Sequence, residues 1–587
     1  MKRILIIGAI LLVGAVAWYF WIEGSRTEIY RFENVSGPDT ETPIANPVPV
    51  SLQDFDRGGP NRLAVLVTDP ASDWVGLLRG FKSQGISVTF TRDPAKALRH
   101  QVIIAYPGIS GRLLSQTAIR SLARHVQGGG TLLTFDLAGG GLEELFGISR
   151  QIPSRERNTI RWKGESAPEE RLSRFSSGRA EVKIGSIGLL TTSAETLASF
   201  EDGKAAVVCR RAGGNACLLG VDPGSMAQRA MNGRSELFSP DFVNGYQPSL
   251  DIIFRWIRDL YVEGEDDPFL IGTAPSGFKG SLILTHDVDF TRSVGNSVAY
   301  ADAIRKRGVS ATFLIQTKYI RDWNDDVFFN HANLPSLKRV ARGMEIGSHS
   351  VSHTRAFRKF EMGSGEEYYP RYRPFVESRN KARDGTILGE LRVSKYLIEH
   401  LVGAPVRSFR PGHLAFPEAL PEALAATGYR YSSTLTANSA QTHFPFQLSY
   451  SRSARGLLPA WEFPVTIEDE KPPRLGDRLE ASITLIDKIA ANEGVAVVLI
   501  HPDVKDHKLK FEEQLIDRMK GKVWIGSLGA FGDWWSARDQ ADFDFEGGIL
   551  TVNAPASLQG VEIRFPKGPR ASFSLRGVKG RQAIPLR

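Results

Sequence analysis

Two successive series of apolar strand segments, each alternating with amphipathic helical segments, constrain the fold of this chain most strongly. The segments of the first series lie at residues 63–67, 74–84, 86–90, 101–106, 115–127 and 131–135. Strands that alternate with helices in this way are typical of a parallel sheet covered by helices on both faces. A second series begins beyond Gly277 and runs to about residue 540. We therefore predict an α/β protein with two such units.

The segments between and beyond the two series define the predicted domain boundaries. An early stretch rich in Pro, Asp, Thr and Asn is typical of a linker, and an acidic hinge follows a helical pattern at residues 251–262. Short strand patterns with Gly and Pro turns predict a small β appendage at the end. The predicted parts are an anchor at 1–23, a linker at 24–60, the first unit at 61–265, the second unit at 275–540 and the appendage at 541–587.

The first 23 residues predict a membrane anchor. Residues 4–22 carry no charge and would span about 28 Å as a helix, close to the hydrocarbon thickness of a bilayer. Lys2 and Arg3 precede this run, and aromatic residues at 18–21 follow it, as at a membrane interface. We expect an uncleaved, single-pass transmembrane helix with the remaining chain on the periplasmic or extracellular side. A cleaved signal peptide is the alternative.

Charge and cysteine content exclude some classes of function. Lys and Arg exceed Asp and Glu by only 8 residues in 587, without a long basic block, so no nucleic-acid partner is expected. Two cysteines are too few for a thiolate zinc site. Cys209 and Cys217 flank a predicted hairpin around Gly213-Gly214, where they face each other either as a disulfide or as two buried thiols.

The first unit resembles the glutamine-amidotransferase-like α/β fold. The resemblance depends on Tyr-Pro-Gly at residues 106–108, three glycines at 128–130 and the strand end at 218–222. Enzymes of that fold use a cysteine at a sharp turn after a strand, and the equivalent residues 134–137 contain none. The resemblance therefore implies a non-catalytic spacer or a glycan-binding module.

Acidic and imidazole side chains follow two strand patterns of the second unit. Asp287 and Asp289 end an apolar run, and residues two apart in an extended chain point to the same side. His349 and His353 follow a second run, and histidines four apart share one face of a helix. Carboxylate and imidazole groups together suit a divalent metal ion. The combination predicts a metal site at the carboxyl edge of a sheet.

Two further motifs follow apolar runs in the same unit, Arg410-Pro411-Gly412-His413 and Leu499-Ile500-His501. With the motifs above, this order and spacing resemble the polysaccharide deacetylase family (carbohydrate esterase family four, the NodB homology domain). Residues 429–433 and 461–464 also resemble later strand ends of that family. The resemblance covers about residues 275–540 and implies a distorted (β/α) barrel.

The resemblance also implies a role for each motif residue. It makes Asp287 the catalytic base, Arg410 the group that holds this base, and His501 the general acid. Asp289, His349 and His353 would be the metal ligands; Leu499, Gly412 and His413 would contact the substrate. The family usually has Thr-Phe-Asp-Asp-Gly, whereas this chain has Thr-His-Asp-Val-Asp at residues 285–289, so Asp289 stands one position late.

The function that the resemblance implies is metal-dependent removal of acetyl groups, foremost N-acetyl groups, from an envelope or secreted polysaccharide. Zinc is the first expectation for the metal, and cobalt, nickel or iron suit the same ligands. Two alternatives remain: hydrolysis of C–N bonds in small non-sugar molecules, and a catalytically silent glycan-binding or scaffold protein.

Two other features of the sequence can each be interpreted in two ways. His286 and His413 adjoin the motifs, where they contact substrate or only pack. The long insertion at residues 355–383, with its tyrosines and arginines, either grips a sugar chain or packs and solvates a loop; the second interpretation is slightly favoured.

Overall fold

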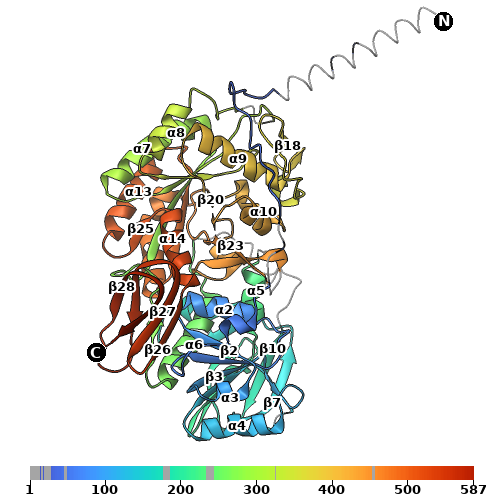
Figure 1. Cartoon of the computed structure of the whole chain (residues 1–587), viewed down its shortest axis with the longest axis vertical. Helices are drawn as coiled ribbons and strands as arrows, with labels where there is room; N and C mark the ends of the chain where they lie inside the picture. Colours follow the sequence, from blue (N-terminus) through green and yellow to red (C-terminus); the bar gives the residue numbers. More distant parts are fainter. Residues whose placement is uncertain are drawn as a thin grey trace, which may run out of the picture.

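The computed structural model describes residues 14, 18, 28–44, 46, 49–139, 141–175, 185–232, 244–323, 326–452 and 456–586. It is an α/β structure in which two large sheets and one small sheet belong to successive parts of the chain (Figure 1). The first unit is at the bottom of the view, the second above it, and the small C-terminal sheet beside their junction.

The sheet of the first unit has a parallel half and an antiparallel half. Its main path runs β2-β1-β3-β5-β13-β12-β11-β8-β9, with β10 and β7 attached to it. The parallel strands are β1 (Leu63–Val67), β2 (Val88–Thr91), β3 (Val102–Tyr106), β5 (Thr131–Thr134) and β13 (Gly214–Leu219). The others are β7 (Ile148–Ser154), β8 (Thr159–Trp162), β9 (Leu172–Arg174), β10 (Ser186–Thr191), β11 (Glu195–Phe200) and β12 (Ala205–Ala212). The short strands β4 (Ile109–Ser110) and β6 (Leu137–Ala138) pair separately.

Helices cover both faces of the parallel half. On β1, Leu63 and Val65 belong to one buried cluster while Ala64 and Leu66 belong to another, as expected for a strand covered on both sides. The helices are α2 (Trp74–Ser83), α3 (Pro94–Ala97), α4 (Gln116–Gln127), α5 (Pro223–Ala230) and α6 (Ser249–Gly264). The cluster that contains Leu63 continues into the second unit, so the two units share one core.

The second unit is built on a mainly parallel sheet of order β22-β23-β21-β20-β17-β16-β15-β24, with β25 on β15. Its strands are β15 (Ser281–Val288), β16 (Thr312–Ile315), β17 (Glu345–Ser348), β20 (Ser408–Phe409), β21 (Tyr431–Ser432), β22 (Phe446–Ser449), β23 (Leu457–Glu462), β24 (Val495–Ile500) and β25 (Trp524–Gly526). Beyond β23, Ile467 pairs with Val498 of β24, and the Leu499 N–H donates to the Ile467 carbonyl at 2.8 Å. These contacts close the sheet irregularly into a distorted barrel.

Helices surround this barrel, and a β unit ends the chain. The helices are α7 (Thr291–Lys306), α8 (Leu334–Ala341), α9 (Ile387–Leu401), α10 (Leu420–Ala426), α11 (Ala437–Ala440), α12 (Leu479–Ala491), α13 (Asp506–Met519) and α14 (Leu528–Gln540). The 3-10 helices are η1 (Leu52–Phe55), η2 (Pro168–Arg171), η3 (Arg355–Lys359), η4 (Gly412–Leu414), η5 (Tyr450–Arg452) and η6 (Leu475–Arg478). The last sheet contains β14 (Leu270–Ile271), β26 (Asp542–Glu546), β27 (Ile549–Arg564) and β28 (Phe573–Pro585), and the insertion adds the hairpin β18 (Phe375–Ser378) and β19 (Lys381–Arg383).

The structure does not support the predicted transmembrane anchor. Among the residues that the structure describes, no helix is both long and apolar enough to cross a membrane. The longest, α6 and α7, have 16 residues each, whereas a span needs about 20. The predicted segment at residues 1–23 lies outside the described residues except for Gly14 and Trp18. The prediction of a single-pass anchor, on which the membrane contact and the extracytoplasmic placement depended, is therefore not supported.

The segment predicted as a linker contacts the second unit in its described part. Ile29 forms a β-bridge with Ile320, and Gly37 forms one with Tyr369. Phe32 is buried, and the Arg392 side chain donates to the Thr40 carbonyl at 2.9 Å. This stretch is therefore held along the second unit. In the first unit, Cys209 and Cys217 form a disulfide across the paired strands β12 and β13.

Candidate metal and catalytic site

The carboxyl ends of the barrel strands bring the predicted site residues to one edge of the sheet. His349, Arg410 and His501 each directly follow the last residue of a strand, which is β17, β20 or β24. Asp287 is the second-last residue of β15, and Asp289 comes just after that strand. Because these strands are parallel, their carboxyl ends converge. All these side chains except Arg410 line one cavity of about 190 Å³.

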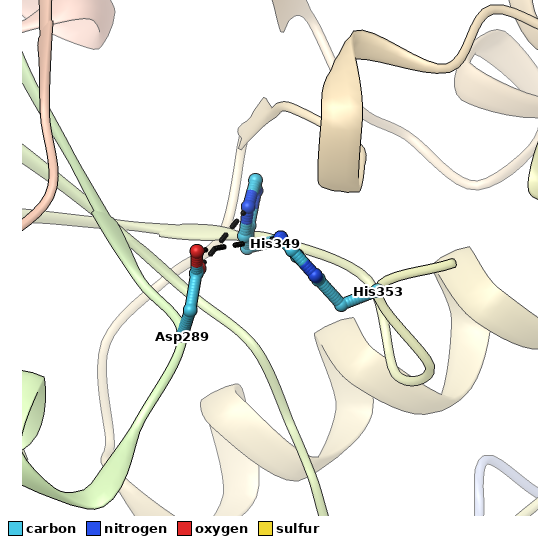
Figure 2. Close-up of side chains that lie close together, drawn as sticks. All are labelled: Asp289, His349 and His353. Carbon is cyan, nitrogen blue, oxygen red and sulfur yellow. Dashed lines mark ion pairs between the residues drawn. The ribbon is translucent and has the colours of Figure 1, made fainter. Parts of the chain in front are cut away.

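Asp289, His349 and His353 present three ligand atoms to one point (Figure 2). The Asp289 carboxylate lies 3.3 Å from His349 Nε2 and 3.4 Å from His353 Nε2. The histidines are not on a helix: His353 lies in a turn with a φ of 49°, which returns its ring toward His349. The Asp289 position, one residue later than in the usual motif, therefore still reaches both imidazoles.

The polar atoms of this cluster fit a bound cation. The Nδ1–H of His349 donates to the Arg410 carbonyl at 2.7 Å, which leaves Nε2 with a lone pair. Nε2 therefore faces an Asp289 oxygen as acceptor to acceptor, and both atoms are buried without a hydrogen-bond partner among the described residues. One carboxylate and two imidazoles are the donor set that zinc, cobalt, nickel and iron accept.

Burial and charge set the protonation of these three groups. Burial lowers the pKa of His349, which favours the neutral ring that a metal requires. Burial acts to raise the pKa of Asp289, but its interactions with the imidazoles, foremost that of His353, hold the pKa well below its usual range. The pKa of His353 is raised because its attraction to Asp289 exceeds the effect of burial.

Arg410 holds Asp287 at the wall of the cavity. The guanidinium is fully buried, and its Nη1 donates to Asp287 Oδ1 at 2.8 Å and to Thr285 Oγ1 at 2.9 Å. Its other nitrogens donate to the carbonyl and hydroxyl of Ser433, each at 2.7 Å. The arginine is thus fixed on both sides, and it fixes one carboxylate oxygen of Asp287. The other oxygen, Oδ2, lies 3.8 Å from His349 Nε2.

His501 is held across the cavity by Asp469, a residue that the sequence did not single out. His501 Nδ1 lies 2.7 Å from Asp469 Oδ1, and the His501 backbone N–H donates to Asp469 Oδ2 at 2.7 Å. Lys508 lies 2.7 Å from the same carboxylate. Burial acts against the charged imidazole, but Asp469 raises the pKa of His501 well above its usual value. Asp469 itself is buried, yet His501 and Lys508 lower its pKa to about 2.

The three predicted substrate contacts have different positions. Leu499 and His413 line the cavity, and the His413 ring lies 4.7 Å from that of His353. Burial, reinforced by the charges of His353 and Arg355, lowers the pKa of His413 to about 3. Gly412 instead lies against the His353 side chain, where a Cβ atom would approach the ring to 2.5 Å.

We expect Gly412→Ala to reduce metal affinity about 10- to 100-fold, because the added methyl group pushes the His353 ring away from Asp289. Titration of the metal-free protein with zinc would measure this change. Gly295→Ala is the matched control, since no atom lies within 4 Å of the Cβ position there. Equal zinc affinity in both variants would contradict the packing role of Gly412.

Of the residues adjoining the motifs, His286 does not face the cavity. It is fully buried, its Nε2 lies 3.0 Å from Glu512, and its ring stacks on Phe313. Its role is therefore packing. Asp469 could have been suspected from the acidic run Glu468-Asp469-Glu470 after β23, but only the barrel closure brings it to His501.

Comparisons with known proteins agree with the motifs. A family model described as polysaccharide deacetylase matches residues 277–432, which include the residues from Asp287 to His413 but not Leu499 or His501. No curated protein matches the chain. The model does not extend to residues 61–265, whose amidotransferase-like resemblance stays a prediction.

This chain is similar over part of its length to several solved structures. A polysaccharide deacetylase candidate from Mycobacterium smegmatis is 16% identical, covers 45% of this chain and 93% of its own, and has a TM-score of 0.34. A CE4 esterase from Streptococcus mutans is 18% identical, with 42% and 86% covered and a TM-score of 0.26. A CE4 family pseudoenzyme from Bacillus anthracis is 16% identical, with 44% and 66% covered and a TM-score of 0.27. The match of the family model shows that residues 277–432 carry a polysaccharide deacetylase domain, as the motifs around Asp287 and His349 indicated.

Proposed function

We propose that this protein is a metal-dependent hydrolase that removes acetyl groups, foremost N-acetyl groups, from a polysaccharide. The observation that carries the proposal is the buried cluster of Asp289, His349 and His353, in which Asp289 Oδ1 and His349 Nε2 face each other without a hydrogen-bond partner among the described residues. Two ionisable side chains, Asp287 and His501, line the same cavity, and each is held by a different charged partner. A metal site flanked by one base and one acid suits hydrolysis of an acyl bond.

Asp289, His349 and His353 would hold the ion. When bound, a divalent ion polarises the acyl carbonyl and lowers the pKa of water. Asp287 is the proposed base: its Oδ2 faces the cluster, while Oδ1 is held by Arg410. Asp287 accepts a proton from the attacking water as the new C–O bond forms.

His501 is the proposed general acid. Asp469 holds Nδ1 and favours the imidazolium, so Nε2 carries a proton at the cavity, 3.5 Å from Asp289. This proton passes to the departing sugar nitrogen as the C–N bond breaks, which leaves acetate and a free amine. Leu499 lies in the same cavity and supplies an apolar surface for the acetyl methyl group.

Acetate release tests the proposal. The protein is purified, its metal content is measured, and acetate is assayed with N-acetylglucosamine oligomers and with other acetylated glycans. We expect release that a chelator abolishes and zinc or cobalt restores. Failure to release acetate from any acetylated glycan, with metal bound, would overturn the proposal. Hydrolysis of a small ureide but of no glycan would favour the alternative of a hydrolase for small non-sugar molecules. Glycan binding without any hydrolysis would favour a catalytically silent glycan-binding protein.

A separate prediction concerns Asp469 as a positioning residue. We expect Asp469→Asn to lower kcat about 10- to 100-fold, because the amide no longer stabilises the His501 imidazolium or its tautomer. The decrease should lie in kcat with KM nearly unchanged, and metal content should stay the same. Asp506→Asn is the matched control, since Asp506 makes an Asp–His pair with His507 at the surface. A change in metal content instead of kcat would contradict the role.

A further inference from the structure

A basic groove continues from the catalytic cavity over the insertion that follows the metal histidines. It consists of two hollows of about 390 and 690 Å³, which share Arg379, and His413 lines both of them as well as the catalytic cavity. We define the basic groove by its cationic residues, which are Arg355, Arg358, Lys359, Arg379 and Lys471. Arg355, Arg358 and Lys359 come from the 3-10 helix η3, and Arg379 from the turn between β18 and β19.

Four of the five cations of this groove have no acidic partner in the described part of the chain. Arg355, Arg358, Lys359 and Arg379 are exposed, and within the described ranges no acidic residue forms an ion pair with any of them. Glu470 is the one acidic residue among those that line the larger hollow, and the smaller hollow is lined by Asp289 and by Asp322, which pairs with Lys318. Cations held together without acidic partners repel one another and attract an anionic ligand.

The catalytic cavity has the opposite character. Its lining includes five carboxylates, Asp287, Asp289, Glu468, Glu470 and Asp503, against two cations, Lys508 and the His501 imidazolium, and so has an excess of acidic groups. An anionic sugar would be repelled from these carboxylates, whereas an uncharged acetylated sugar would not. The basic groove next to this cavity instead attracts an anionic sugar. The two regions together select a chain in which an uncharged acetylated residue lies beside anionic residues.

An exposed aromatic side chain completes the groove. Trp323 is 62% exposed and lines the smaller hollow with Arg379 and His353. Its backbone N–H donates to the Val376 carbonyl at 3.1 Å, which ties it to the β18 hairpin. The neighbouring Lys318 and Asp322 are buried and pair with each other, so they do not compete for a ligand. An exposed indole beside a polar groove is a surface on which a sugar ring can stack.

We propose that the basic groove binds the acidic residues of an anionic polysaccharide while its acetylated residue occupies the catalytic cavity. The inference rests on the proposed deacetylase function and names the substrate class of that site. Carboxylate groups of the chain pair with Arg355, Arg358 and Arg379, and one sugar ring stacks on Trp323. Two tyrosines of the insertion, Tyr369 and Tyr372, have another role: they are buried and pack the loop.

Two oligosaccharides of equal length test the charge requirement. Hyaluronan hexasaccharide alternates N-acetylglucosamine with glucuronate, whereas the chitin hexamer contains N-acetylglucosamine alone. We expect kcat/KM to be at least tenfold higher for the hyaluronan hexamer at low ionic strength, and this preference to decrease as salt is added.

The variant Arg355→Gln/Arg358→Gln/Arg379→Gln should remove the preference, with at least a tenfold loss for hyaluronan and less than a twofold change for chitin. The triple variant Arg576→Gln/Lys579→Gln/Arg581→Gln on β28 removes equal charge from another exposed surface and should change neither. Trp323→Ala, at an exposed position, should weaken binding of both hexamers.

Equilibrium binding to both hexamers separates the two proposals. If chitin is deacetylated normally and the groove variant loses nothing with hyaluronan, the groove inference fails while the deacetylase function stands. If neither hexamer releases acetate but the groove variant loses hyaluronan binding selectively, the deacetylase proposal fails while the anionic ligand stands. Equal losses for both hexamers would also overturn the charge requirement.

Discussion

Replacement of His353 by Gln is expected to lower acetate release about 10³-fold and to leave the purified protein with little bound metal. The ring is one of only three donors in the cluster, and Asp289 and His349 alone hold a divalent ion weakly. Loss of the ion removes several kcal/mol of transition-state stabilisation, and each 1.36 kcal/mol corresponds to a tenfold change in rate. Metal content by mass spectrometry and acetate release by a coupled assay measure the two effects.

Two further variants make this result specific. His349→Gln should have the same effect, although His349 is fully buried and its variant needs a thermal unfolding control. His400→Gln is the matched control, because His400 lies exposed at the end of α9 and stacks on Tyr396. Full metal content together with full activity in His353→Gln would contradict the ligand assignment.

The strands of the barrel and the positions of its motif residues could be predicted from the sequence because both signals are local. The strands at residues 281–288 and 495–500 are buried at every position and contain the apolar runs 282–284 and 495–500, which is the pattern of a covered parallel strand. In a parallel barrel, a polar residue that directly follows such a run must lie at the common carboxyl edge. That rule predicted Asp289 and His349 at one edge without any knowledge of their contacts, and the resemblance to the polysaccharide deacetylase family added Arg410 and His501.

Non-local contacts could not be predicted in this way. Asp469 reaches His501 only because residues 465–467 close the barrel against β24, and no local pattern specifies that closure. The segment at residues 28–44 has the composition of a linker, yet Phe32 and the bridge at Ile29 dock it on the second unit. The spacing of His349 and His353 suggested a helix, whereas a turn with positive φ brings the rings together.

The predicted anchor shows a second limit of prediction from local sequence properties. Hydropathy over residues 4–22 satisfies the length rule for a membrane span, but that rule uses one local property and no tertiary contact. The helices in the part of the chain that the structure describes do not meet the same rule. The arginines of the insertion at residues 355–383 were visible in the sequence, but the groove that they form with Lys471 depends on how η3 and the β18 hairpin fold together.

Replacement of Asp287 by Asn is expected to lower kcat by about 10² to 10⁴, the range that general-base catalysis contributes. The amide has nearly the same shape and keeps an oxygen for Arg410, so the buried guanidinium stays satisfied. What is lost is the ability of the second oxygen to accept a proton. Because Asp289, His349 and His353 are unchanged, metal content should equal that of the parent protein, and the kinetic and metal measurements together separate a base from a ligand.

The usual motif of the family offers two adjacent carboxylates, whereas Val288 separates the two here, and Asp287→Asn decides which of them is the base. If Asp287 held the metal instead, its variant would lose the ion along with activity. If the protein were a silent glycan-binding module, neither the parent nor the variant would release acetate, and both would bind glycan equally. Asp487→Asn on the exposed face of α12 is the matched control and should keep full activity. Retention of metal with a loss of 10² or more in kcat would assign proton transfer to Asp287, since its neighbour Asp289 is the carboxylate that faces both imidazoles.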